Sequence, residues 1–355
     1  MDNVKRTLCL SVCLTFAFGG IGCSASDANV EKNNIKNVIL VIGDGMGENH
    51  IQNALTYFEL SAPTFMSDKY GKVLTYSNDN GVTDSAAAAS AMATGQKVNN
   101  SSIAYAPDGT QLTSISELAK QAGKKVGIVT TDSLDGATPA GFSSHAKTRG
   151  ESETIAKGQA QSGIDLFIGK STSAYQTTYS QFFMQSGYEM AYSAPNMQTF
   201  SNTNKLVTLL NETRSSYNPD IQNEYSLKDM VAFALDFLDN DDGYFLMVEG
   251  AYIDKFSHDN QLIPALCEVR SLFDTVDFLY NTVGEDTAIL ITADHETGLL
   301  RKAQKKDELG NFLYGSSGHS FTAVPLFVKN FTMQSETEFI ENTEIFEICK
   351  NLLKL

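Results

Sequence analysis

The sequence predicts an α/β fold, a three-layer α/β/α arrangement in which helices cover both faces of a central, mostly parallel β-sheet. Two observations lead to this prediction. Several runs of β-branched and apolar residues are hydrophobic without alternation, as is typical of strands buried on both faces of a parallel sheet. Helical patterns lie between these runs from one end of the chain to the other, and no repeat or low-complexity linker divides them. We therefore expect a single domain over residues 36–355.

The individual elements follow from local sequence. The predicted strands are continuous apolar runs, which cover residues 37–42, 125–131, 164–169, 244–250, 287–292 and 324–328. The predicted helices have apolar residues at helical spacing, over residues 115–122, 227–238, 265–281 and 338–353. The segment 171–225 is rich in serine, threonine, asparagine, glutamine and tyrosine without a strong period, so we expect surface loops with small elements there.

The first residues resemble an export signal. Lys5 and Arg6 precede an apolar stretch, residues 8–21, that is too short for a comfortable membrane span. Residues 1–23 are therefore predicted to be a signal peptide, and Cys23 after Gly-Ile-Gly resembles a bacterial lipoprotein site. The polar residues 24–35 would then form a tether. We expect an exported protein of the periplasm or outer envelope, with lipid anchoring through Cys23 as an open alternative.

Charge and cysteine content narrow the class of protein. The chain has 42 acidic and 26 basic residues, a net charge of −16, which argues against nucleic acid as a specific partner. Acidic side chains gathered in one cleft would instead attract cations. Cys267 and Cys349 lie in helix-like apolar patterns after the signal region, and we expect buried free thiols, although an exported protein would permit a disulfide.

The alanine-rich stretch over residues 81–95 predicts a helix, with Asp84 or Ser85 as its N-terminal cap. Such a position would place the Ser85 hydroxyl near unpaired backbone N–H groups and the positive end of the helix dipole. By itself this stretch is more consistent with a capped structural helix than with a reactive site.

Acidic residues follow three of the predicted strands. Asp44, Glu249 and Asp294 lie at or just after the carboxyl ends of these strands, where ligand sites in open α/β sheets are found. Three carboxylates at one sheet edge would need hydrogen bonds, partners or cations. Asp254 and His258, four residues apart, would share a helical face, and Asp294 with His295 supplies the mixed oxygen and nitrogen ligands that zinc accepts.

Six motifs in order resemble the alkaline phosphatase family of metal-dependent phosphomonoesterases. They are residues 41–47 (VIGDGMG), 83–86 (TDSA), 137–140 (ATPA) with Arg149, 248–255 (VEGAYIDK) with His258, 292–298 (TADHETG) and 318–319 (GH). Together they extend over about residues 36 to 330. The resemblance implies two Zn²⁺ and one Mg²⁺ per subunit. The implied ligands of the three ions are, in turn, Asp254, His258 and His319; Asp44, Asp294, His295 and Ser85; and Asp44, Thr138 and Glu249.

The resemblance also implies roles around the ions. Ser85 would be the nucleophile, Arg149 would bind the phosphoryl oxygens as a bidentate fork, and Asp84 would orient Arg149. For Lys255 two alternatives stay open, contact with phosphate through water or an ion pair with a carboxylate. His145 is expected to be a surface or packing residue rather than a ligand.

The chain departs from the family pattern in two places. Some relatives have an acidic or histidine side chain two residues before the threonine of the third site, where this chain has Gly136, and Asp132 or Asp135 would have to substitute. The segment between Gly298 and Gly318 is short where larger relatives carry an insertion, which predicts an open cleft with weak selectivity for the alcohol. Homodimers are common in the family, but this missing insertion weakens that expectation.

The function implied is hydrolysis of phosphate monoesters to alcohol and inorganic phosphate through a phosphoserine at Ser85, with a broad substrate range. A phosphodiesterase or sulfatase of the same superfamily is the nearest alternative. From another class, a non-catalytic metal- or phosphate-binding envelope protein would share some of these features.

Overall fold

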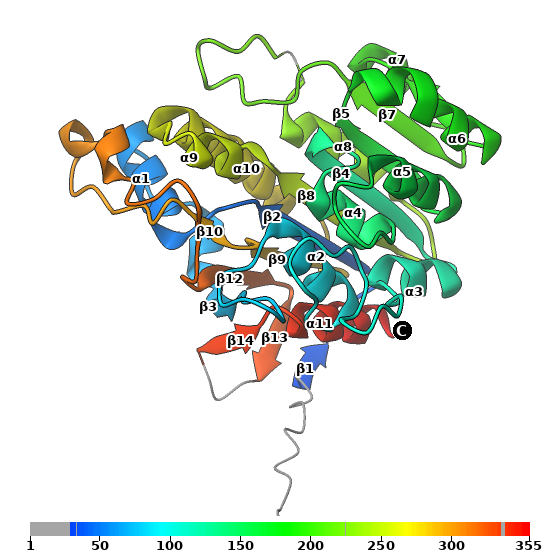
Figure 1. Ribbon diagram of the computed structural model, residues 1–355, viewed down its shortest axis with the longest axis horizontal. Helices are drawn as coiled ribbons and strands as arrows, with labels where there is room; N and C mark the ends of the chain where they lie inside the picture. Colours follow the sequence, from blue (N-terminus) through cyan, green and yellow to red (C-terminus); the bar gives the residue numbers. More distant parts are fainter. Residues whose placement is uncertain (1–28, 33, 224, 335–337) are drawn as a thin grey trace, which may run out of the picture.

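A computed structural model describes residues 29–32, 34–223, 225–334 and 338–355 (Figure 1). Among them, ten strands form the central sheet. Their order is β14 (Phe339–Glu341), β3 (Lys69–Leu74), β12 (Val324–Lys329), β9 (Thr287–Thr292), β2 (Asn37–Gly43), β8 (Tyr244–Gly250), β4 (Lys125–Ser133), β5 (Leu166–Lys170), β7 (Leu206–Leu210) and β6 (Glu189–Ala191). Strand β12 pairs antiparallel with both neighbours, and the other pairings in this sheet are parallel. The predicted α/β fold with a mostly parallel sheet is confirmed.

Helices pack in two groups against this sheet (Figure 1). One group comprises α1 (Glu48–Phe58), α8 (Leu227–Leu238), α9 (Tyr252–His258) and α10 (Leu262–Thr282). The other comprises α2 (Ser85–Thr94), α3 (Ile115–Gln121), α4 (Ala137–Ser143) and α11 (Glu344–Leu353). Helix α5 (Ser152–Gln161) packs against α4 and α6 (Ser180–Gln185), and α7 (Ala194–Gln198) packs against β6 and β7. Capping boxes at Ser114 and Ser226 stop the backbone N–H groups at the starts of α3 and α8 from being left unpaired.

The centre of the sheet is the most apolar part of the protein. Strands β8 and β9 are buried along their whole length, and β2 is buried after its first residue. Their continuous hydrophobic sequence is explained by helices that pack on both faces. The carboxyl ends of β2, β8 and β9 are therefore held in place by a closely packed core.

Two short additional sheets lie outside the central one. Strand β1 (Asn29–Lys32) pairs antiparallel with β13 (Phe331–Gln334), and β10 (Glu296–Thr297) pairs antiparallel with β11 (His319–Ser320). The second of these pairs brings residues on either side of the 298–318 segment together. No helix among the described residues has both the length and the apolar character that crossing a bilayer requires.

The structure differs from the predicted elements in three places. The segment 171–225 has the small elements that were expected, including α6 and α7, but two of them, β6 and β7, are strands of the central sheet, and β7 is buried throughout. The C-terminal helix begins at Glu344 rather than at residue 338, since residues 339–341 form β14 and cover the edge of β3. The half-buried alternation of β3 itself was not recognised as a strand.

The described residues include only part of the N-terminal region for which predictions were made. The signal peptide over residues 1–23 and lipidation at Cys23 lie outside the described residues and stay predictions. The tether over residues 24–35 also stays a prediction; within it, residues 29–32 pair with β13 and Ile35 is buried. The prediction of buried free thiols at Cys267 and Cys349 is confirmed.

Candidate active site

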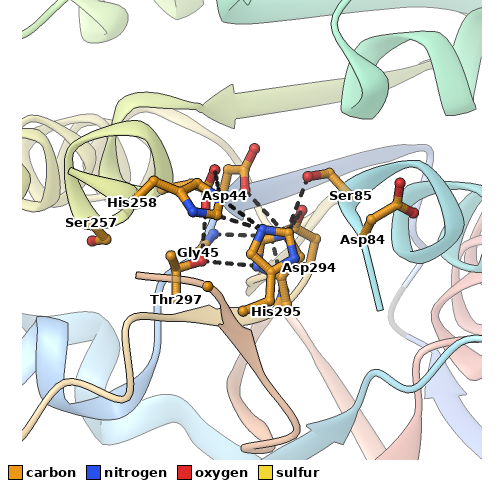
Figure 2. Close-up of polar contacts among 12 residues, drawn as sticks. Asp44, Gly45, Asp84, Ser85, Ser257, His258, Asp294, His295 and Thr297 are labelled. Atoms are coloured by element: carbon orange, nitrogen blue, oxygen red, sulfur yellow. Dashed lines mark hydrogen bonds and ion pairs between the residues drawn. The ribbon is translucent and has the colours of Figure 1, made fainter. Parts of the chain in front are cut away.

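The carboxyl ends of three adjacent central strands gather the acidic residues. Strand β2 lies between β8 and β9, with Ile42 in register with both Glu249 and Thr292. Asp44 directly follows β2, Asp294 comes two residues after the end of β9, and Glu249 is the second-last residue of β8, so the three predicted carboxylates share one edge of the sheet. Figure 2 shows Asp44 and Asp294 side by side there. The short turn after β2 is held in place by the Gly45 N–H, which donates to Asp294 Oδ1 at 3.1 Å.

Six side chains form two groups whose donor atoms can surround a cation. One group is Asp254, His258 and His319, the other is Asp44, Asp294 and His295, and in each the donor atoms lie within 4.8 Å of one another. These are the two sets that the sequence assigned to the zinc ions. Their mixture of carboxylate oxygen and imidazole nitrogen suits zinc.

Hydrogen bonds determine which ring nitrogen each histidine presents. His258 Nδ1 lies 2.6 Å from the Ser317 carbonyl oxygen, and His319 Nδ1 lies 2.9 Å from that of Thr83. Carbonyl oxygens only accept, so both Nδ1 atoms carry a proton, and in the neutral rings both Nε2 atoms carry a lone pair. The two Nε2 atoms lie 3.0 Å apart, and His258 Nε2 also lies 3.3 Å from Asp254 Oδ2, a hydrogen bond that raises the pKa of His258 to about 9. A cation would replace this Nε2 proton and bind the lone pairs of both rings, so the residues present fit a metal.

The same argument applies to His295. Thr297 Oγ1 donates to Asp254 Oδ1 at 2.5 Å, and therefore accepts the His295 Nδ1 proton at 3.2 Å (Figure 2). His295 Nε2 therefore carries a lone pair, and it lies 3.2 Å from Asp294 Oδ2 and 3.6 Å from Asp44 Oδ1. Thr297 thus links the two ligand groups. Thr297 belongs to the 292–298 motif, but no role for it was expected from sequence.

Buried oxygen atoms without partners mark the rest of the site. Asp44 Oδ1, Asp294 Oδ2 and Thr138 Oγ1 are buried and make no hydrogen bond within the described residues. Such atoms are costly unless a ligand satisfies them. The oxygen-only set of Asp44, Thr138 and Glu249, implied for a third ion, suits magnesium.

Burial and mutual repulsion act on these carboxyls. Burial, together with the charges of Asp294, Asp254 and Glu249, raises the pKa of Asp44 well above its ordinary value. Burial, followed by the nearby charge of Asp132, raises the pKa of Glu249 to about 8. Burial and the charge of Asp254 raise the pKa of Asp294 to about 6. So much negative charge in one buried place favours bound divalent cations.

Ser85 is the first residue of α2 and lies beside the second ligand group. Asp84 caps the helix, because its Oδ1 accepts the Ala87 N–H at 2.9 Å. The Ser85 side chain is buried, and its Oγ lies 3.2 Å from His295 Nε2 (Figure 2). The alanines behind it pack closely against α4, where a Cβ at Gly141 would lie 2.9 Å from that of Ala89.

Arg149 reaches the same place from the loop before α5. Its Nη1 lies 3.3 Å from Asp84 Oδ2, which also accepts the Ser101 N–H. Asp84 therefore uses one oxygen to cap α2 and the other to hold Arg149. The Arg149 side chain is 42% exposed, so its guanidinium remains accessible to a ligand.

The structure separates the alternatives left open for other residues. Lys255 Nζ forms an ion pair with Asp132 Oδ1, which is the carboxylate alternative. Glu249 Oε2 accepts a hydrogen bond from Thr130, a partner that sequence reasoning did not identify. His145 Nε2 lies 2.9 Å from the Leu112 carbonyl oxygen, consistent with the expected packing role.

Comparison with known proteins gives one consistent result. The family model described as alkaline phosphatase matches residues 35–172 and 176–353. Alkaline phosphatases 3 and 4 of Bacillus subtilis are each 32% identical to the chain, over 83% and 77% of its length. The matches cover 70% and 64% of those relatives, which are longer proteins.

Solved structures agree. The alkaline phosphatase from the Antarctic bacterium TAB5 superimposes with a TM-score of 0.80 at 29% identity, covering 90% of this chain and 98% of that one. A variant of the TAB5 protein has magnesium bound in a site named M3.

Proposed function

The chain belongs to the alkaline phosphatase family, and from this premise we propose that it hydrolyses phosphate monoesters to an alcohol and inorganic phosphate. The observation that carries the proposal is the position of Ser85, whose Oγ lies 3.2 Å from His295 Nε2 at the edge of two clustered ligand groups. A structural helix cap alone does not explain why a serine hydroxyl lies among unpaired carboxylate oxygens.

Ser85 is the proposed nucleophile. Its Oγ forms a bond to phosphorus as the bond to the alcohol oxygen breaks, and water then displaces the serine to release inorganic phosphate. The N-terminus of α2 favours the anion through its dipole. The residues that would hold the metals are Asp254, His258 and His319; Asp44, Asp294 and His295; and, for magnesium, Asp44, Thr138 and Glu249. When bound, these ions supply Lewis acidity toward phosphoryl oxygens and lower the pKa of a nearby hydroxyl.

Monoesters are favoured over diesters by the donors around Ser85. A phosphate monoester is a dianion with three terminal oxygens, which the exposed fork of Arg149 can bind in pairs. A diester has only two terminal oxygens and one negative charge, so if Arg149 bound both of them, no terminal oxygen would remain for the cations that the two ligand groups would hold. We propose a broad range of alcohols, because the connection between Gly298 and Gly318 is short and His258 is 40% exposed.

The test is a comparison of two substrates with metal-loaded protein. Turnover of p-nitrophenyl phosphate is expected to exceed that of bis-p-nitrophenyl phosphate by at least about 100-fold in kcat/KM. A higher kcat/KM for the diester would instead identify a phosphodiesterase. If the protein bound metal and phosphate but turned over neither ester, it would be a non-catalytic metal- or phosphate-binding protein.

Arg149→Ala is expected to weaken binding of inorganic phosphate about 10- to 100-fold, because two charge-assisted hydrogen bonds are lost. The measurement is the competitive inhibition constant of phosphate against p-nitrophenyl phosphate. Arg270→Ala is the matched control, since Arg270 forms its ion pair with Asp274 within α10. An unchanged constant in Arg149→Ala would remove this residue from the phosphate site.

A further inference from the structure

We propose that Asp132 positions the third cation. Its carboxylate can lie beside the cation site because Gly136 has no side chain to occupy the same space. The proposal rests on the proposed function, because it concerns the magnesium site implied for Asp44, Thr138 and Glu249. In this chain the Asp132 carboxylate comes from the end of β4, and the ion pair with Lys255 holds it in place.

Position 136 requires a glycine because there is no space for a side chain, and not because of its backbone conformation. It precedes the first residue of α4, with φ −54°, which any residue adopts. A Cβ at this position, however, would lie 2.7 Å from Asp132 Oδ2 and 2.9 Å from the Ser133 carbonyl oxygen. The Asp132 carboxylate therefore occupies the space that a side chain at position 136 would take. Thr138, whose buried Oγ1 has no partner among the described residues, follows two residues later on α4.

A second set of contacts ties Asp132 to Glu249. Thr130 Oγ1 donates to Glu249 Oε2 and accepts the Asp132 N–H at 2.8 Å. One hydroxyl thus connects the backbone of Asp132 to a predicted ligand of the third ion. The two carboxylates are also electrostatic neighbours.

The two oxygens of Asp132 are used differently. Oδ1 accepts from Lys255 Nζ and from the Ser133 N–H, which fixes the orientation of the carboxylate. Oδ2 faces Gly136 and makes no hydrogen bond to another described residue. Magnesium in proteins usually keeps several of its waters. A carboxylate oxygen that is oriented but unpaired is suited to accept hydrogen bonds from those waters.

Asp135 is the other carboxylate near Gly136, and after burial its charge is the next cause that raises the pKa of Tyr175 and Tyr179. Its Oδ1 is buried without a hydrogen-bond partner among the described residues, whereas the charges that raise the pKa of Glu249 are those of Asp132 and Asp294. Asp135 is therefore a matched control, an aspartate three residues away on the same connection.

The experiment measures Mg²⁺ binding by calorimetry on zinc-loaded protein, without substrate. Asp132→Asn is expected to weaken Mg²⁺ binding about 10- to 100-fold, as loss of a residue that orients a metal shell does. Asp135→Asn is expected to stay within about twofold of the unmodified protein. Zinc content and the unfolding midpoint without Mg²⁺ are expected to be the same in all three proteins, which separates cation positioning from a structural role.

A second variant tests the shared space. Asp132→Ser combined with Gly136→Asp moves the carboxylate to position 136. The 2.7 Å conflict with Asp132 is then removed, and the 2.9 Å approach of the new Cβ to the Ser133 carbonyl oxygen requires a small shift of the backbone. The double variant is expected to recover Mg²⁺ affinity relative to Asp132→Ser alone. A folded double variant without recovery would contradict the assignment of this space to the cation.

The outcomes separate this inference from the proposed function. Unchanged Mg²⁺ affinity in Asp132→Asn, or a loss in Asp135→Asn alone, would overturn the inference while monoester turnover still supports the function. Conversely, Mg²⁺ affinity that depends on Asp132 in a protein without monoester turnover would support the inference and refute the proposed function.

Discussion

Ser85→Ala is expected to lower turnover of p-nitrophenyl phosphate by at least about 1,000-fold while the cation content stays the same. The physical reason is that the hydroxyl is the proposed point of attack, whereas the two ligand groups remain complete without it. The α2 helix should also remain, because its cap is Asp84 and its other residues are mostly alanine.

The measurement combines steady-state kinetics, metal analysis and acid quenching with labelled substrate. Acid quenching should trap phosphoserine at Ser85 in the unmodified chain and no phosphorylated residue in the variant. Ser116→Ala is the matched control, since the Ser116 hydroxyl is also buried, has no partner among the described residues, and lies on α3. Label found on another residue would show that Ser85 is not the nucleophile.

Removal of the cations is expected to abolish turnover and to lower the free energy of unfolding. Each ion held at about 1,000 times its dissociation constant contributes about 4 kcal/mol to stability when it binds only the folded state. Without ions, the carboxyls of Asp44, Glu249 and Asp294 stay buried together. Turnover should return when Zn²⁺ and Mg²⁺ are added back. Full turnover by protein shown to be metal-free would refute the proposed chemistry.

The metal-free protein should also become less stable between about pH 6.5 and 8. Burial raises the folded-state pKa of Glu249 to about 8, and its hydrogen bond with Asp254 raises that of His258 to about 9. In this range the folded state binds more protons than the unfolded state, so the free energy of unfolding falls as pH rises. Urea unfolding at several pH values measures this slope. The metal-loaded protein should show a smaller slope, because bound cations replace those protons.

Local sequence patterns predicted the centre of the fold and the carboxylates at the strand ends, while the resemblance to the alkaline phosphatase family implied the complete ligand sets and the roles of Ser85 and Arg149. Strands β2, β8 and β9 are buried on both faces, so their sequences are uniformly apolar and their ends are easy to locate. Parallel neighbours bring those ends to one edge, which is why Asp44 and Glu249 could be placed together from sequence. The helical spacing of Asp254 and His258 required no tertiary information.

The elements that sequence reasoning missed are those that depend on neighbours. β7 is a buried five-residue run inside a polar segment, and its sheet position comes from β5 and β6 on either side. β14 is formed by residues 339–341 because β3 offers an unpaired edge there. The local sequence of β7 cannot be told from that of a loop, and the local sequence of β14 cannot be told from the start of a helix.

The sequence by itself determined the fold class and the carboxylates and histidines near the strand ends, since burial and strand ends leave periodic or local patterns, and six ordered motifs supplied the resemblance that implied a phosphatase site. Only the tertiary structure decided which partner each polar side chain takes. Lys255 lies on α9 and Asp132 on β4, 123 residues apart, and their ion pair depends on how the two elements pack. The space beside Gly136 is likewise decided by packing, because a glycine in the sequence does not indicate which neighbouring side chain occupies the space next to it.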